Sequence, residues 1–126
     1  MSRVKARDTR PEMFVRSLVH RLGYRFRLHC NALPGKPDLV FSSRQKVIFV
    51  HGCFWHSHRG CANARVPKSR LTFWIEKLSA NKARDTRILR TLTRLGWAYL
   101  VVWECDMAYP EALAGKIIEF LEARES

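Results

Sequence analysis

Acidic side chains and long apolar runs are both scarce in this chain of 126 residues. Asp and Glu number 11 against 23 Lys and Arg, which gives a formal net charge of +12. The longest uninterrupted apolar run, residues 97–103, is far shorter than the roughly 20 residues that a membrane-spanning helix needs. No apolar stretch typical of a signal peptide follows the basic first residues, so we expect no membrane segment and a cytoplasmic location.

Internal repeats, low-complexity tracts and linkers rich in Pro or Ser are also missing. The length fits one domain, and 47% hydrophobic residues with 11% aromatic ones suffice for a buried core. These proportions exclude a disordered or fibrous chain. We therefore expect residues 1–126 to form a single domain.

The excess of positive charge, with a sequence pI near 10.3, is typical of a protein that binds a polyanion. A surface charged only for solubility would carry both signs in closer balance. A membrane-surface protein would need a basic amphipathic helix, which the sequence does not show. Nucleic acid is therefore the expected partner, and charge alone leaves both DNA and RNA open.

The pattern of apolar residues predicts a first helix and six further elements. Thr9 and Glu12 have the spacing of a capping box, and apolar residues recur at helical spacing from Phe14 until Gly23. The further elements are strands at 24–28, 38–41 and 47–50, a helix at 71–95, a strand at 97–103 and a helix at 110–123.

This order, α-β-β-β-α-β-α, predicts an α/β fold with a mixed sheet flanked by helices. The apolar runs at 47–50 and 97–103 are typical of strands buried on both faces, and the long helix between them is the crossover that parallel strands need. The Pro- and Gly-rich turn at 33–37 places Asp38 at the start of one strand, and His51 follows the end of the next.

Four cysteines in a chain without an export signal are interpreted as metal ligands before disulfides. Cys53, His58 and Cys61 lie close in sequence, and Cys105 follows the last predicted strand. Three thiolates and one imidazole are the ligands of a closed structural Zn²⁺ site. The alternative is that the cysteines are small buried residues and the histidines are solvated. Cys30 has no partner at ligand spacing and is expected to be a half-buried thiol.

A second candidate site combines a carboxylate with two histidines. Asp38 is expected at the mouth of the sheet, near the point where His51 emerges. Such a carboxylate is a ligand for Mg²⁺, which phosphodiester hydrolysis uses to neutralise phosphate charge and activate water. His56 is not needed by the zinc count, and an imidazole suits proton transfer near neutral pH. The alternative is an ordinary turn aspartate beside two structural histidines.

The middle of the predicted helix at 71–95 carries polar residues that fall near one another, with Trp74 before them: Lys77, Asn81, Arg84 and Asp85. A solvated face and a face toward DNA are equally compatible with this pattern. In the second interpretation Asp85 orients a catalytic histidine. Phe54 and Trp55 either pack beneath the zinc site or form a wedge between base pairs.

Four segments make the chain recognisable: LPGKPD at 33–38, VIFVHGCFWH at 47–56, FWIEK at 73–77 with Asn81, Arg84 and Asp85, and VWEC at 102–105. Over nearly its whole length the chain resembles the very short patch repair DNA mismatch endonucleases. The resemblance implies a restriction-endonuclease-like fold and a Mg²⁺-dependent nick beside the thymine of a T:G mismatch.

The resemblance also implies roles for individual residues. Asp38 is similar to the metal-binding aspartate, and the backbone carbonyl of Val50 is the expected second contact to the metal. His56 resembles the general base, with Asp85 as its partner. His51 matches a second catalytic histidine and Glu12 an acidic residue of the first helix.

The remaining matches concern zinc and DNA. Cys53, His58, Cys61 and Cys105 match structural zinc ligands, and Phe54 and Trp55 match intercalating aromatics. Lys77 and Asn81 match positions facing the mismatch, and we expect Trp74 and Arg84 on the same DNA-facing surface.

The chain departs from the family pattern at three places. Its N-terminal arm is shorter, so that Met1 stands at the position of a residue that helps to wedge the DNA. Val50 stands where Thr is frequent. One additional residue separates His58 from Cys61, which leaves Asn63 and His56 as alternative zinc ligands.

Two alternative functions remain beside the mismatch endonuclease: a zinc-stabilised DNA-binding module without catalysis, and a nuclease of relaxed specificity. For the favoured function we expect double-stranded DNA with a T:G mismatch as partner, other mismatch-repair proteins as further candidates, a monomeric state, and a cytoplasmic, nucleoid-associated location.

Overall fold

The computed structural model describes residues 9–28 and 30–123. Helix α1 (Arg10–Arg21) is followed by strands β1 (Leu39–Phe41) and β2 (Lys46–His51), the long helix α2 (Leu71–Arg94), strand β3 (Ala98–Trp103) and helix α3 (Pro110–Glu122). Short 3₁₀ turns lie at Ser42–Arg44, Ala62–Ala64 and Glu104–Ala108. None of the helices in the described part is long and apolar enough to cross a membrane.

The three strands form a mixed sheet in the order β1-β2-β3. β1 pairs with β2 antiparallel, Leu39 opposite Ile48, and β2 pairs with β3 parallel, Ile48 opposite Leu100. The start of β1 and the ends of β2 and β3 therefore lie at the same end of the sheet. This topology brings Asp38, His51 and the residues after Trp103 to one end of the sheet.

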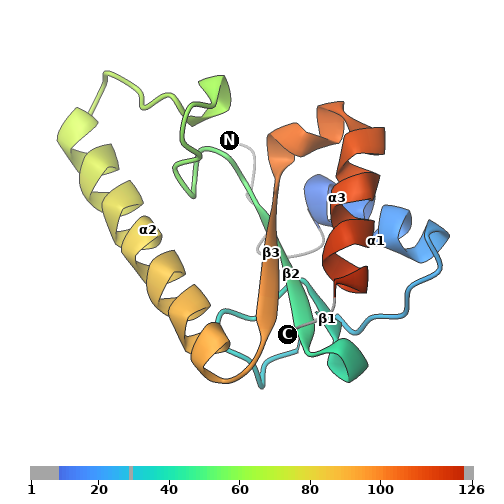
Figure 1. Ribbon diagram of the computed structural model, residues 1–126. Coiled ribbons are helices and arrows are strands. Elements are labelled where there is room, and N and C mark those ends of the chain that lie inside the picture. The colour runs from blue at the N-terminus through green and yellow to red at the C-terminus, as the bar shows by residue number, and fades with distance from the viewer. Residues whose placement is uncertain (1–8, 29, 124–126) are drawn as a thin grey trace.

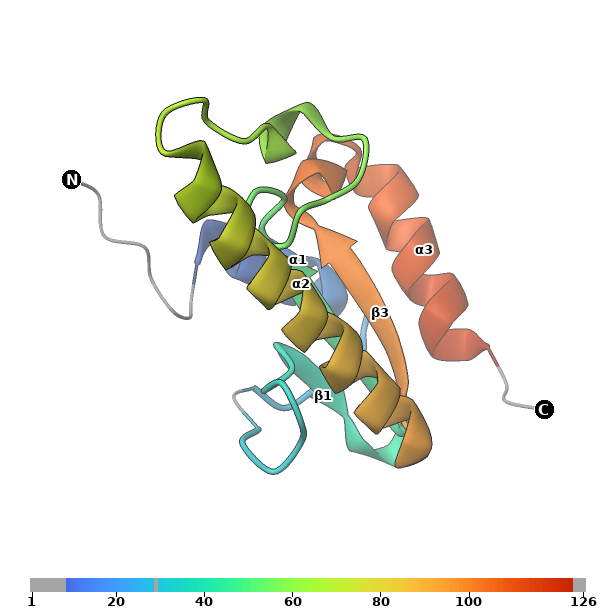
Figure 2. The same cartoon turned by 90° about the vertical axis from the view of Figure 1, so that its left-hand side faces the viewer.

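Helices cover both faces of the sheet (Figures 1 and 2). One core contains Val15 and Val19 of α1 and Leu113 and Ile117 of α3, packed on the face that includes Ile48. The opposite face, with Val47 and Phe49, packs against Leu92 of α2 and the partly buried Ile88 and Leu89. The predicted α/β class with a helix-flanked mixed sheet is confirmed.

The capping box at the start of α1 is also confirmed. The Glu12 N–H donates to Thr9 Oγ1 and the Thr9 N–H donates to Glu12 Oε2, each at 3.4 Å. These two bonds satisfy donors that the first turn of a helix leaves without partners. The box fixes Glu12, which is only 7% exposed, at the end of the sheet where β2 and β3 finish.

The strand predicted at 24–28 is wrong as a strand. Within the described residues this segment makes a single antiparallel bridge, in which Arg27 and Val40 exchange two backbone hydrogen bonds of 2.9 Å. The reason lies in the partner: in this register Arg25 would pair with Ser42, where β1 has ended and a 3₁₀ turn begins. The observed order is therefore α-β-β-α-β-α.

Burial is less complete than predicted at two places. β3 is an edge strand of the described sheet, and its Leu100 and Val102 pack in one core and Val101 in the other, but Tyr99 is 39% exposed. Ile75, one of the apolar residues of the predicted helix at 71–95, is half exposed because only the second half of α2 packs on the sheet, whereas its first half diverges (Figure 1). Cys30 is partly buried, as predicted.

Candidate active site

A cleft of about 580 Å³ opens at the sheet end where Asp38 and His51 lie. The first turn of α1, the turn before β1, the end of β2 with the loop after it, and the middle of α2 contribute its lining, which includes Glu12, Asp38, Val50, His51, Phe54, Trp55, His56 and Asp85. The cleft thus contains all five residues predicted to be catalytic. Segments far apart in the sequence supply them.

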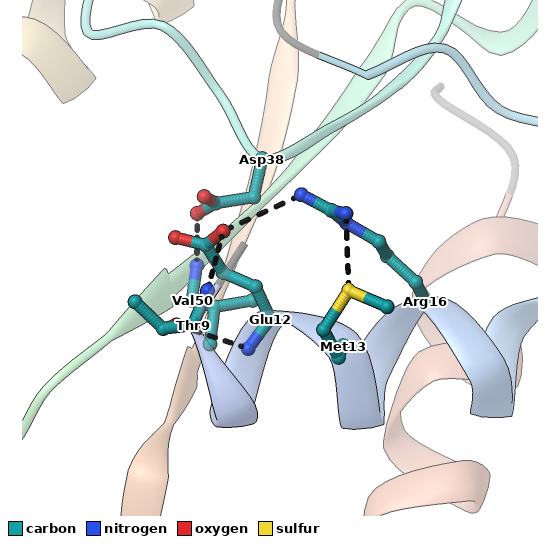
Figure 3. A network of polar contacts seen from close by, with 6 residues as sticks. All are labelled: Thr9, Glu12, Met13, Arg16, Asp38 and Val50. Carbon is teal, nitrogen blue, oxygen red and sulfur yellow. Dashed lines mark hydrogen bonds and ion pairs between the residues drawn. The ribbon is translucent and has the colours of Figure 1, made fainter. Parts of the chain in front are cut away.

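Two of the residues that line this cleft, Glu12 and Asp38, bring their carboxyl groups close together (Figure 3). Asp38 Oδ2 accepts a hydrogen bond of 2.6 Å from the backbone N–H of Val50 on β2. Glu12, projecting from α1, faces Asp38, and Arg16 one turn further on contacts the Glu12 carboxylate at 3.4 Å. The capping box and the ion pair with Arg16 hold Glu12 in place, so α1 positions one carboxylate and β1 the other.

Burial raises the pKa of Asp38 from 3.8 to about 7. The Val50 N–H and the positive charge of Arg16 oppose this rise, whereas the neighbouring Glu12 carboxylate adds to it. Without a cation, Asp38 thus resists ionisation. Oxygen ligands crowded in this way are the usual setting of a hard divalent cation.

Two stacked imidazoles form the opposite part of the cleft. The rings of His51 and His56 are nearly parallel, with their centroids 3.8 Å apart. His56 Nδ1 lies 2.6 Å from Asp85 Oδ2 of α2. Burial, assisted by His56, lowers the pKa of His51 from 6.5 to about 4, and Asp85 opposes this shift. His51 is therefore neutral at pH 7, and Asp85 anchors the ring of His56.

The predicted zinc ligands converge beside the cleft. One ligand atom from each of Cys53, His58, Cys61 and Cys105 lies within 4.8 Å of the others. Tetrahedral bonding to zinc places sulfur ligands about 3.8 Å apart, so the four side chains need to close only slightly around an ion. Burial and the adjacent Cys53 and Cys61 thiols raise the pKa of the Cys105 thiol to about 12. This cluster could bind a metal ion, and His56 is not part of it.

An aromatic wall borders the cleft: Phe54 and Trp55 line it, and Trp74 of α2 packs against them. Phe54, Trp55 and Trp74 contact one another with ring centroids 5.1 to 5.9 Å apart. Asn81 donates to the backbone carbonyl of Trp55 at 3.3 Å, and Arg84 donates to Asn81 Oδ1 at 2.5 Å. These bonds tie α2 to the loop after β2.

Among the described residues, those predicted to bind DNA lie along the first half and the middle of α2 and in the adjacent loop. Lys77 and Arg84 are exposed, whereas Asn81 is partly buried. Met1 lies outside the described residues.

Two residues of the site were missed by the sequence analysis. Arg16 pairs with Glu12, and their spacing of four residues on one helix is a signal that could have found it. Trp103 stacks on His58 at 4.0 Å and meets the edge of His51 at 5.3 Å, so that it lies between the cysteine cluster and the histidine pair. Its neighbours come from other parts of the chain, and no local pattern indicates this role.

Comparison with known proteins agrees with a nuclease cleft. Residues 1–63 match the family described as DNA mismatch endonuclease Vsr. The chain belongs to this family of endodeoxyribonucleases.

Individual relatives extend the similarity to nearly the whole chain. The Type II nicking enzyme V.XorIIP of Xanthomonas oryzae pv. oryzae is 51% identical over 122 residues, which cover 97% of this chain and 89% of the relative. DNA mismatch endonuclease Vsr of Escherichia coli is 42% identical over 118 residues, or 94% of this chain and 75% of that protein. The Type II nicking enzyme V.NmeAIP of Neisseria meningitidis is 38% identical over 85% of this chain and 76% of its own length.

Proposed function

We propose that this protein is a Mg²⁺-dependent endonuclease that nicks double-stranded DNA beside the thymine of a T:G mismatch, in very short patch repair. The observation that carries the proposal is the meeting of Asp38 and Glu12 with the pair His51 and His56 in one cleft of a strongly basic chain. A restriction-endonuclease-like fold, formed as a single domain by a monomer, belongs to the same proposal.

Asp38 and the backbone carbonyl of Val50 would hold the Mg²⁺ ion. The Val50 N–H already points to Asp38, and in a strand the N–H and C=O of one residue point to the same side. The largely buried Asp38 carboxyl, whose pKa is raised, fits a site that gains from a cation. When bound, the ion neutralises charge on the scissile phosphate and lowers the pKa of an attacking water.

Proton transfer falls to the histidines in this proposal. Asp85 accepts the hydrogen bond of the His56 Nδ1–H, which leaves Nε2 of the same ring free to accept a proton from water. His51 lies against His56 and, being neutral, donates or accepts a hydrogen bond on the leaving side. Glu12 would add negative charge beside Asp38 and so favour a cation there.

The cysteine cluster would hold a structural Zn²⁺ ion through Cys53, His58, Cys61 and Cys105. Three thiolates and one imidazole leave no open coordination position, which suits a structural rather than a catalytic ion. In this role the cluster would anchor the loop after β2 to the turn after β3, and with it both His51 and His56.

DNA would lie across the aromatic wall of the cleft. Phe54 and Trp55 line the cleft with Trp74 packed against them, and such large rings suit insertion between base pairs. Lys77, Asn81 and Arg84 lie along the same side of α2. Met1 remains a predicted part of this wedge. Other mismatch-repair proteins remain predicted partners, and such a substrate would place the enzyme at the cytoplasmic nucleoid.

The test is a nicking assay with Mg²⁺ on end-labelled duplexes that carry either T:G or T:A in a cytosine-methylation-type site. We expect one nick beside the mismatched thymine, lost in Asp38→Ala and retained in the control Glu119→Ala, an exposed carboxylate on α3. Binding of the mismatch without a nick would favour a recognition module instead. Equal cutting of both duplexes would favour a nuclease of relaxed specificity.

A further inference from the structure

The cleft contains a second group of metal-ligating atoms besides the cysteine cluster. One ligand atom from each of His51, His56 and Asp85 lies within 4.8 Å of the others. Asp38 and Glu12 are not members of this group. The proposed Mg²⁺ site is built from oxygen atoms, whereas this triad offers two nitrogens and one oxygen.

This donor set has its own metal preference. Mg²⁺ binds oxygen ligands and keeps much of its water, whereas two imidazoles with one carboxylate suit the borderline ions Zn²⁺, Co²⁺ and Ni²⁺. The triad would therefore take a different ion from the one that Asp38 takes. The triad is also separate from the cysteine cluster, because the ring of Trp103 lies between His51 of the triad and His58 of the cluster.

His51 provides an independent sign that the triad is incomplete. The side chain is 7% exposed, and its buried Nδ1 has no hydrogen-bond partner among the described residues. A buried polar atom without a partner is costly, so it usually marks a missing ligand, ion or water. Bonds of about 2.1 Å to a tetrahedral ion place ligand atoms roughly 3.4 Å apart, so the two stacked rings must turn their nitrogens toward a shared ion. The open cleft leaves room for a water as fourth ligand.

We propose that His51, His56 and Asp85 form an inhibitory site for a borderline divalent transition-metal ion, with Zn²⁺ as the natural candidate. An ion held there occupies the imidazole that otherwise accepts the proton of the attacking water. The inhibitory effect rests on the proposed function, whereas binding of the ion does not. The protein then binds zinc twice, once at the cysteine cluster and once, reversibly, in the cleft.

Binding is tested by titrating the zinc-loaded protein with Co²⁺ and following its visible absorption. We expect one further equivalent whose bands lack the thiolate-to-cobalt charge transfer typical of a cysteine site. His51→Gln and Asp85→Asn should each lose this equivalent, and His20→Gln, an exposed histidine on α1, should retain it. Circular dichroism verifies the fold of each variant. No further equivalent in the wild type, or its retention in folded His51→Gln and Asp85→Asn, would overturn the site.

Inhibition is tested by nicking at constant Mg²⁺ while a metal buffer raises free Zn²⁺. We expect the rate to fall by at least about 100-fold as the second equivalent binds, in line with loss of a general base, and to return when that equivalent is removed. A second equivalent that binds without slowing the nick would refute inhibition. Absence of nicking at every Zn²⁺ concentration would refute the proposed function, and the cobalt titration would still decide the site.

Discussion

At the scale of single residues, Asp38 shows how the surroundings set the chemistry of a side chain. Its carboxyl is partly buried next to Glu12, and it accepts a hydrogen bond of 2.6 Å from the Val50 N–H. A carboxyl in such a place keeps its proton to unusually high pH unless a cation is present. The residue most important for the proposed reaction is thus one that costs stability when it ionises.

This cost predicts a pH dependence of stability. Asp38 has a pKa of about 7 in the folded protein against 3.8 as the ordinary value, so the folded state binds more protons between these pH values. Its favourable contribution is fully present below pH about 4 and is lost as the pH rises through about 7. Relative to Asp38→Asn, which cannot ionise, the wild type should lose on the order of 4 kcal/mol across this window.

Urea denaturation of both proteins at pH 4 to 8, without added Mg²⁺, measures this difference. The comparison cancels His51 and other groups common to both chains. Added Mg²⁺ at pH 8 should restore stability to the wild type but not to Asp38→Asn. A constant difference between the two proteins across the pH range would contradict the burial-driven shift.

The sequence alone identified candidate site residues but not the contacts between them. Asp38, His51 and His56 could be selected because their residue types and places near strand ends suit hydrolysis. The stacking of His51 on His56, and the place of Trp103 between two clusters, depend on how α2, β2 and β3 meet. Such tertiary contacts leave no periodic or spacing signal in a single chain.

At the scale of elements, α1 positions Glu12 in the cleft. Its first turn is fixed by the capping box, and its apolar face packs on the sheet through Val15 and Val19. The capping residues and the helical spacing are local features, which is why α1 could be predicted accurately. The segment at 24–28 could not, because its pairing depends on where β1 ends.

Removal of the cap should therefore destabilise the protein. Thr9→Ala deletes the acceptor for the Glu12 N–H and should lower the free energy of unfolding by about 1 kcal/mol. Ser17→Ala, at an exposed position of the same helix, serves as the control and should lower it little. Urea denaturation at one pH measures both variants. Equal stability of Thr9→Ala and wild type would show that the cap is dispensable.

Lys46 of β2 performs a comparable function for α3. This lysine is only 4% exposed, and its Nζ donates to the carbonyl oxygens of Phe120 at 2.6 Å, Leu121 at 3.2 Å and Ala123 at 2.6 Å. The last carbonyls of a helix lack partners within the helix and carry partial negative charge, so a buried cation suits them. β2 thereby fixes the end of α3.

Lys46→Met should lower the free energy of unfolding by about 3 kcal/mol, because it leaves the carbonyls of Phe120 and Ala123 without their charged donor, whereas Leu121 keeps a bond from Arg44. Lys116→Met, which changes an exposed lysine on α3, is the matched control. Thermal and urea denaturation should both show the difference. If the two variants were equally stable, water would have to replace the ammonium group, and the proposed anchoring would fail.

At the scale of the whole molecule, the two faces of the sheet have different roles. α1 and α3 cover one face, and α2, with most of the predicted DNA contacts, covers the other. The net charge of +12 reveals an affinity for polyanions but not which face meets the DNA. That asymmetry emerges only from the folded arrangement.

The asymmetry predicts unequal effects of single charges on DNA binding. Affinity should fall steeply with salt, since each phosphate contact releases counterions. Lys77→Ala, on the exposed side of α2, should reduce the slope of log K against log salt by roughly 1. Lys116→Ala on α3 should leave the slope unchanged. Fluorescence anisotropy with a labelled duplex measures both, and equal slopes for the two variants would reject α2 as the binding face.

The eight residues from His51 to His58 contribute side chains to three parts of the site. They supply both cleft histidines, two rings of the aromatic wall, and two side chains of the cysteine cluster. An inserted residue anywhere in this stretch would displace the cleft histidines relative to the ligands of the cysteine cluster. The exposed segment 67–70, by contrast, contributes no side chain to either group of ligands. Engineering that alters loop length, or grafts this loop onto another scaffold, would therefore have to transfer 51–58 as one indivisible block and confine any change of length to segment 67–70.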